Sequence, residues 1–141
     1  MIAVSDFVHT LEKKGINFFV GVPDSLLKDL TSFINENPEN RKYLITANEG
    51  NAIAVASGYN MATEKVPAVF MQNSGLGNAI NPLLSLCDED VYSIPMIVMI
   101  GWRGHPDIID EPQHLKQGKI QIKLLARDKW RVPSAAVSRV H

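Results

Sequence analysis

Cysteine is almost absent from this 141-residue sequence, which contains only Cys87. One cysteine excludes an intrachain disulfide and a cysteine-based metal cluster, and a thiol nucleophile would need a histidine placed beside it. We therefore expect Cys87 to be a small, at least partly buried side chain. Long apolar runs are also missing: none approaches the roughly 18 residues of a membrane span, and no basic region precedes an apolar run at the N-terminus. These absences predict a cytoplasmic protein without a membrane segment.

An excess of charge of one sign is missing as well. The chain has 14 Lys and Arg against 15 Asp and Glu, for a formal net charge of -1. Such a balance provides no field that would attract a phosphate backbone, so nucleic-acid binding is not expected. With 45% hydrophobic and 21% charged residues, the composition is that of an ordinary globular chain, and its length is that of one domain.

Short apolar segments alternate with helical patterns along most of the chain. Strands are predicted at residues 16–20, 43–47, 68–72 and 96–100. Helices are predicted at residues 5–14, 26–36, 52–58 and 79–86, the first capped by Ser5 and ended by Gly15. Strands separated by helices favour βαβ units. The predicted fold class is therefore α/β, a doubly wound, flavodoxin-like parallel sheet with helices on both faces.

The loops that follow the predicted strands should converge on one rim of such a sheet. Glu49 lies in one of them, at the start of a helix, where the helix dipole favours a carboxylate, so on position alone helix capping is the better explanation. The loop 74–78 has two glycines that allow close approach by a ligand. It matches neither a Rossmann fingerprint nor a P-loop, which leaves a tight turn and a ligand loop equally open.

A further polar segment, residues 110–114, follows Arg103 and His105 and indicates a polar site or a lid. His105, Asp110, Glu111 and His114 have no recognised zinc spacing, so no metal site is predicted. Ser74 has neither a G-x-S-x-G elbow nor evident triad partners, which argues against a hydrolase.

Taken together, these segments resemble phosphonopyruvate decarboxylase, a thiamine-diphosphate-dependent 2-oxo-acid decarboxylase. The resemblance is carried by VGVPDS (20–25), ANEGNA (47–52), MQNSGLGN (71–78), IGWRG (100–104) and DEPQH (110–114). It covers roughly residues 1–120, in the family's order and at its separations. It implies that residues 1–120 form a pyrimidine-binding domain, and the sulfopyruvate decarboxylase alpha subunit is the close relative.

The resemblance also implies roles for individual residues. Glu49 would hydrogen-bond the aminopyrimidine of thiamine diphosphate and promote the imino tautomer that deprotonates the thiazolium carbon. The implied catalytic residues are Glu49 and His114. The implied cofactor-binding residues are Glu49, Ser74, Gly75, Leu76, Gly77 and Asn78. The implied substrate contacts are Asp24, Ser25 and Arg103, and the reaction would convert 3-phosphonopyruvate into phosphonoacetaldehyde and carbon dioxide.

The Gly-Asp-Gly motif, with which the family binds diphosphate and Mg2+ in a second domain, does not occur in the chain. The resemblance therefore implies a diphosphate-binding partner subunit or domain, Mg2+ held only through that partner, an oligomer, and no activity of this chain alone. Residues 121–141 are expected to be a divergent C-terminal tail that results from truncation or a frameshift. Two alternatives remain: a sulfopyruvate decarboxylase alpha subunit, or a non-catalytic flavodoxin-like binding or assembly module.

Overall fold

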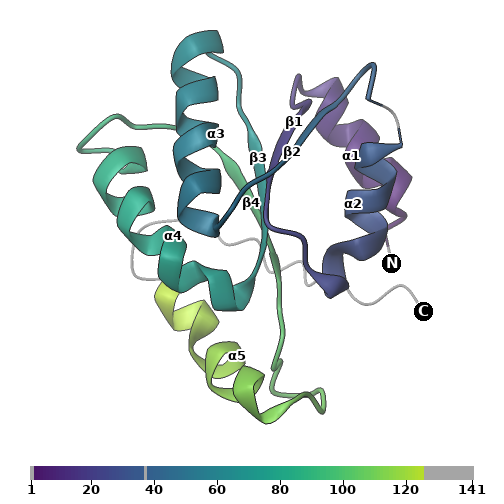
Figure 1. The fold of residues 1–141 in the computed structure, drawn as a ribbon, viewed down its shortest axis with the longest axis vertical. Coiled ribbons are helices and arrows are strands. Elements are labelled where there is room, and N and C mark those ends of the chain that lie inside the picture. The colour runs from purple at the N-terminus through teal and green to yellow at the C-terminus, as the bar shows by residue number, and fades with distance from the viewer. Residues whose placement is uncertain (1, 37, 126–141) are drawn as a thin grey trace.

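A computed structural model describes residues 2–36 and 38–125, and this part of the chain contains a four-stranded parallel sheet (Figure 1). Its strands are β1 (Phe18–Gly21), β2 (Lys42–Ile45), β3 (Ala68–Gln72) and β4 (Ile97–Gly101). They lie in the order β2-β1-β3-β4, and every neighbouring pair is parallel. This is the 2-1-3-4 order of a flavodoxin-like sheet, so the predicted fold class is confirmed.

Helices cover both faces of the sheet (Figure 1). One face carries α1 (Val4–Lys13) and α2 (Lys28–Asn35), and the other carries α3 (Glu49–Thr63) and α4 (Leu76–Pro82). A further helix, α5 (Pro112–Leu125), lies beyond the carboxyl end of β4, below α4 in the figure. Three short elements complete the described part: η1 (Ser25–Leu27), η2 (Asn73–Gly75) and η3 (Leu83–Cys87).

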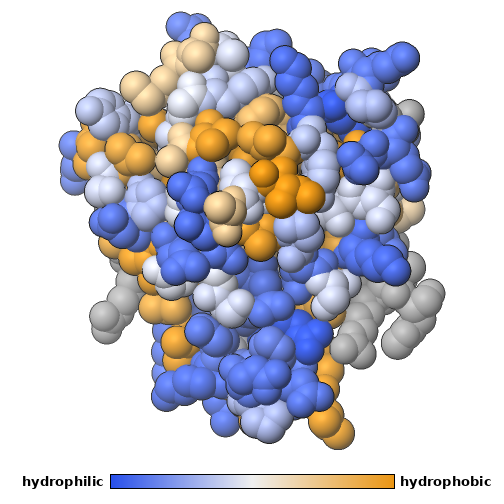
Figure 2. Space-filling view, in the orientation of Figure 1, coloured by the Kyte–Doolittle hydropathy of each residue, from blue (hydrophilic) through white to orange (hydrophobic). Residues whose placement is uncertain are grey.

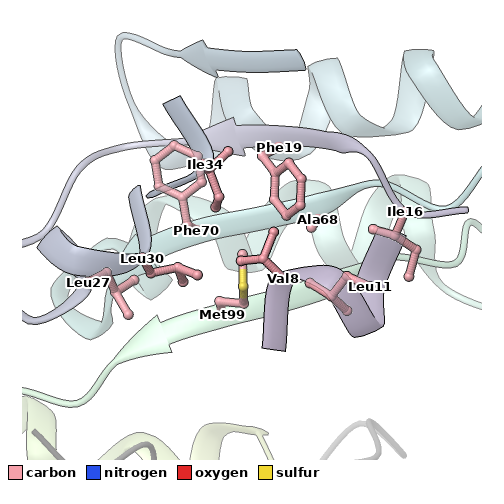
Figure 3. Packing of buried hydrophobic residues seen from close by; sticks show 10 residues of the cluster. All are labelled: Val8, Leu11, Ile16, Phe19, Leu27, Leu30, Ile34, Ala68, Phe70 and Met99. Atoms are coloured by element: carbon pink, nitrogen blue, oxygen red, sulfur yellow. The ribbon is translucent and has the colours of Figure 1, made fainter. Parts of the chain in front are cut away.

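Two hydrophobic clusters, one on each face, hold the helices to the sheet. Figure 3 shows Phe19 of β1 pointing toward Val8 of α1, and Phe70 of β3 beside Ile34 of α2. The next residue along β1, Val20, packs instead into the cluster beneath α3 and α4. Each of these side chains is fully buried, which stabilises the fold by about 1.5–3 kcal/mol per large apolar side chain. The strands are almost continuously apolar because both of their faces are covered.

Several predicted details were wrong at the helix ends. Ser5 does not cap α1, because the helix already begins at Val4 and the N-cap position is Ala3, which makes no side-chain hydrogen bond. The helix predicted at 79–86 starts earlier, at Leu76, and its α-helical part ends at Pro82. A π-helical turn, η3, follows. Proline has no N–H and crowds the preceding turn, which disrupts regular α-helical bonding there.

The helix α5 was not predicted, and its docking depends on backbone contact. A Cβ added to Gly118 would collide with the carbonyl group of Gly104. Backbone atoms cannot move aside cheaply, so Gly118→Ala should destabilise the fold by about 1–3 kcal/mol in urea unfolding. That loss exceeds the gain of up to about 1 kcal/mol from helix propensity. Gly58→Ala in α3 is the matched control: its Cβ would meet nothing within 4 Å, so it should be neutral or stabilising. Equal stability of the two variants would contradict this account.

The expectation for Cys87 is confirmed: its side chain is half-buried, and its sulfur lies 3.3 Å from the Ser57 hydroxyl oxygen. Burial raises the pKa of the Cys87 thiol. Within the described ranges, no helix combines the length and apolar character that crossing a membrane requires. Most of the tail predicted to diverge, residues 126–141, lies outside the described residues.

Candidate functional site

The predicted loops meet where the winding of the sheet reverses. The connection that leaves β1 runs through α2 on one face, whereas the connection that leaves β3 runs through α4 on the other face (Figure 1). Loops that leave neighbouring strands in opposite directions open a crevice at the carboxyl edge, where ligands of doubly wound proteins bind. The turn after β2 joins this edge, because the Thr46 N–H donates to the Gly21 carbonyl at 3.0 Å.

Glu49 is directed away from its own helix. The capping explanation for Glu49 is wrong, because Asn48 caps α3 by accepting the Asn51 N–H at 2.9 Å. The Glu49 carboxylate reaches across to α4, where its Oε2 accepts a hydrogen bond from Asn78 Nδ2 at 2.9 Å. It also lies against Gly75, where any Cβ would collide with the Glu49 side chain. A carboxylate at the start of α3 is thus oriented by Gly75 of η2 and Asn78 of α4.

The structure brings only part of the predicted cofactor set to this carboxylate. Gly75 and Asn78 contact Glu49. Ser74 is exposed and accepts a hydrogen bond from Gln72 Nε2 at 2.7 Å. Leu76 is 2% exposed and packs in the core beneath α4, and Gly77 is exposed. The roles of these loop residues as cofactor ligands stay a prediction.

The predicted substrate residues form a second group at the ends of β1 and β4. Asp24 is buried with its carboxylate packed against Gly101, its Oδ2 accepts the Leu26 N–H at 3.2 Å, and its Oδ1 has no hydrogen-bond partner. Arg103 donates from Nη1 to the Ser25 hydroxyl oxygen over a long 3.5 Å. His114 lies in the first turn of α5, and its backbone carbonyl packs against Gly104, the residue after Arg103. The four predicted residues of this group are therefore neighbours.

Two carboxylates near Arg103, those of Asp24 and Asp110, have pKa values that are shifted in opposite directions. Burial raises the pKa of Asp24 above its usual value of 3.8, although the Leu26 N–H bond and the Arg103 charge oppose the shift. The hydrogen bond from the Gly104 N–H lowers the pKa of Asp110, and the Glu111 N–H and Arg103 act in the same direction. Burial of a carboxyl favours its protonated form, whereas hydrogen bonds donated to the carboxylate favour its ionised form.

The raised pKa of Asp24 predicts a measurable effect on stability. A carboxyl whose pKa is higher in the folded state binds its proton more tightly there, so it lowers stability as the pH rises above 3.8. Asp24→Asn keeps an oxygen for the Leu26 N–H and removes the buried charge. We expect a higher free energy of unfolding than wild type at pH 7, with the gain shrinking toward pH 4 in urea titrations. A variant that is less stable at both pH values would contradict the burial argument.

Two contacts of this group were missed by sequence reasoning. Asn73 is fully buried and donates from Nδ2 to the Arg103 carbonyl at 2.7 Å. Asp110 pairs with Arg103, its Oδ1 lying 2.7 Å from Arg103 Nη2. The sequence marked the segment of Asp110 as polar, but no local pattern indicates which cation it meets. For Asn73 the only signal was its place beside the glycine loop.

Fold and site together define an α/β ligand-binding domain in which a half-buried carboxylate lies on a glycine loop at the switch point. Residues 1–124 match the family model "Thiamine pyrophosphate enzyme, N-terminal TPP binding domain". The chain belongs to this family, as the resemblance of its loops implied, and the membership supports dependence on thiamine diphosphate.

The chain is also similar to individual decarboxylases. It is 42% identical over 125 residues to phosphonopyruvate decarboxylase of Streptomyces viridochromogenes, a match that covers 89% of this chain and 30% of that protein. It is 33% identical over 118 residues to sulfopyruvate decarboxylase subunit alpha of Methanocaldococcus jannaschii, covering 83% and 66%. The chain thus spans about 30% of the length of the phosphonopyruvate decarboxylases that it matches.

Solved structures share the fold. Benzoylformate decarboxylase from Polynucleobacter necessarius superposes with a TM-score of 0.68 at 23% identity, over 92% of this chain and 23% of that one. A putative thiamin diphosphate-dependent enzyme from Mycobacterium smegmatis superposes with a TM-score of 0.58 at 29% identity, over 72% and 19%. Each match covers less than a quarter of the solved chain.

Proposed function

We propose that the chain is the pyrimidine-binding half of a thiamine-diphosphate-dependent phosphonopyruvate decarboxylase. The reaction would convert 3-phosphonopyruvate into phosphonoacetaldehyde and carbon dioxide, and a diphosphate- and Mg2+-binding partner would be required. The observation that carries this proposal is the Glu49 carboxylate, which Asn78 orients and which lies over Gly75 instead of capping its own helix. The family membership and the similarity to phosphonopyruvate decarboxylase support it.

The residues around Glu49 fit an aminopyrimidine. Gly75 leaves space for the carboxylate where any other residue would place a Cβ, and the bond from Asn78 to Oε2 leaves Oε1 for a ring nitrogen. Glu49 would hold and return a proton at that nitrogen. When bound, thiamine diphosphate supplies the carbon nucleophile and the electron sink for decarboxylation. Gly77 and the backbone of Leu76 and Ser74 would line the same side of the ring.

The second group suits the substrate end of the reaction. The guanidinium of Arg103 would offset the substrate's acidic groups, and the Ser25 hydroxyl beside it offers a further hydrogen bond. Asp24, whose pKa is raised by burial, retains a proton more readily than an exposed carboxyl. Together with His114 it would deliver the proton that the product requires after carbon dioxide leaves.

The partner would complete the site by binding the diphosphate and Mg2+, within a cytoplasmic oligomer. Figure 2 shows apolar side chains gathered over the region of β2 and α3. Exposed apolar residues on these elements include Leu44, Ile45 and Val55, at 42%, 56% and 37%. An exposed apolar patch on a folded domain is typical of a surface that another protein covers.

The test is reconstitution. The chain is mixed with a separately expressed diphosphate-binding domain of a phosphonopyruvate decarboxylase, thiamine diphosphate and Mg2+, and carbon dioxide release is followed in a coupled assay. We expect turnover of phosphonopyruvate only when both proteins are present. Full activity of this chain alone, or partner binding without any turnover, would overturn the proposal, and the latter outcome would favour a non-catalytic binding or assembly module.

A sulfopyruvate decarboxylase alpha subunit is the second candidate. One observation favours it: the chain covers 66% of the alpha subunit from Methanocaldococcus jannaschii but only 30% of the phosphonopyruvate decarboxylase. Side-by-side turnover of phosphonopyruvate and sulfopyruvate, with the partner of each class supplied in turn, separates the two candidates.

A further inference from the structure

Asp110 makes more hydrogen bonds than the other carboxylates near the site. Its Oδ1 accepts from Arg103 Nη2 at 2.7 Å and from the Glu111 N–H at 2.8 Å, and its Oδ2 accepts from the Gly104 N–H at 2.8 Å. The side chains of Arg103 and Asp110 are only 19% and 9% exposed. A charge-assisted contact of this length, sheltered from water, fixes the orientation of a guanidinium far better than an exposed pair does.

The backbone of Arg103 is fixed from the opposite side. Asn73, buried in the loop after β3, donates to the Arg103 carbonyl at 2.7 Å. The neighbouring Trp102 donates from its indole N–H to the Gly118 carbonyl of α5 at 3.1 Å. Main chain and side chain of Arg103 are therefore both anchored, which lowers the ordering cost of binding a ligand at the guanidinium.

Donors of Arg103 remain for a ligand. Its Nε is buried without a hydrogen-bond partner, and Nη1 has only the long contact with Ser25. The weakly bonded Nη1 is the donor that an oxygen of a bound anion could use in a charge-assisted hydrogen bond. Asp110 engages Nη2 and leaves Nη1 for an acidic group of the substrate.

We propose that Asp110 is a positioning residue, which aims Arg103 at the second acidic group of the substrate and so selects phosphono- or sulfo-substituted 2-oxo acids over pyruvate. The inference rests on the proposed function. A positioning role and a purely electrostatic role of Asp110 predict opposite effects of its removal on substrate binding. If Asp110 acts only as a negative charge beside Arg103, its removal should tighten the binding of an anionic substrate. If it positions Arg103, its removal should weaken that binding.

The kinetic test compares Asp110→Ala with Asp107→Ala in the reconstituted complex. Asp107 belongs to the same loop and carries the same charge, but its side chain is 89% exposed and its ion-pair contact is with His105 at 3.8 Å. For phosphonopyruvate we expect Asp110→Ala to raise KM about tenfold with kcat within about twofold. The KM for pyruvate should not change, and Asp107→Ala should match wild type. An unchanged or lowered KM for phosphonopyruvate in Asp110→Ala would overturn the proposal.

A second readout needs no turnover. In NMR spectra of the chain alone, the Arg103 Nε–H should exchange slowly with water in wild type and in Asp107→Ala, and much faster in Asp110→Ala. If no 2-oxo acid is turned over, the proposed function has failed, and the exchange rate still decides the positioning role. Equal exchange rates in all three proteins would show that Asp110 does not hold Arg103.

Discussion

Glu49→Gln should lower the decarboxylation rate of the reconstituted enzyme by about 100-fold or more, the usual loss when a proton-transfer group is removed. The amide keeps an oxygen that can accept from Asn78 Nδ2, now 2.9 Å from the carboxylate, so the local structure should persist. An amide does not exchange a proton with a ring nitrogen as a carboxylate does. The rate is measured by carbon dioxide release at saturating cofactor and substrate.

The control for Glu49→Gln is Glu64→Gln. Glu64 is an exposed carboxylate at the other end of the same helix, so this change alters the net charge equally without touching the crevice. We expect wild-type turnover from it and unchanged unfolding midpoints for both variants. A Glu49→Gln enzyme that retains half of the wild-type rate would remove Glu49 from the chemistry.

Gly75→Ala is the second change with a large expected effect, and it should act on activity without much effect on stability. The three atoms nearest to the new Cβ would be Cγ, Cδ and Oε1 of Glu49. The Glu49 side chain can rotate away from Gly75, so the domain should still fold, with Glu49 displaced from Asn78. A displacement of about 1 Å in a catalytic group can cost about 100-fold in rate. We expect a loss of that order.

Gly58→Ala provides the comparison for Gly75→Ala. Gly58 lies in the interior of α3, the helix that begins at Glu49, and a Cβ there would meet nothing within 4 Å. This variant should keep its activity and gain up to about 1 kcal/mol of stability from helix propensity. Similar activity in the two alanine variants would show that the position of Glu49 does not depend on Gly75.

Much of the architecture could be predicted because it depends on local patterns. The strands around Phe19 and Phe70 had to be apolar throughout, since each face of the sheet carries helices. Gly15 ends α1 with a φ of 80°, as its position after the helical pattern indicated. Loops that follow parallel strands must share one rim, which is why the polar segments could be grouped from the sequence alone.

Other features could not be predicted because no local pattern specifies them. Asn48 and Glu49 are both suited to a helix start, and only the position of Asn78 on a different helix shows that the carboxylate reaches outward. The helix α5 has a weak apolar periodicity, and its docking depends on Gly118 meeting the backbone of Gly104, 14 residues earlier. A close contact between two backbone segments cannot be recognised from the amino-acid composition.

The sequence by itself determined the α/β fold class, the order of the loops and the resemblance that led to Glu49, because hydrophobic periodicity and loop motifs are written along the chain. Only the tertiary structure decided which groups meet. Asp24 is a buried carboxyl with a raised pKa, and Gly101 of β4 packs against it. Arg103 forms an ion pair with Asp110 because the chain turns back after β4. Contacts, burial and pKa shifts depend on the distances between residues that are far apart in the sequence, and folding sets those distances.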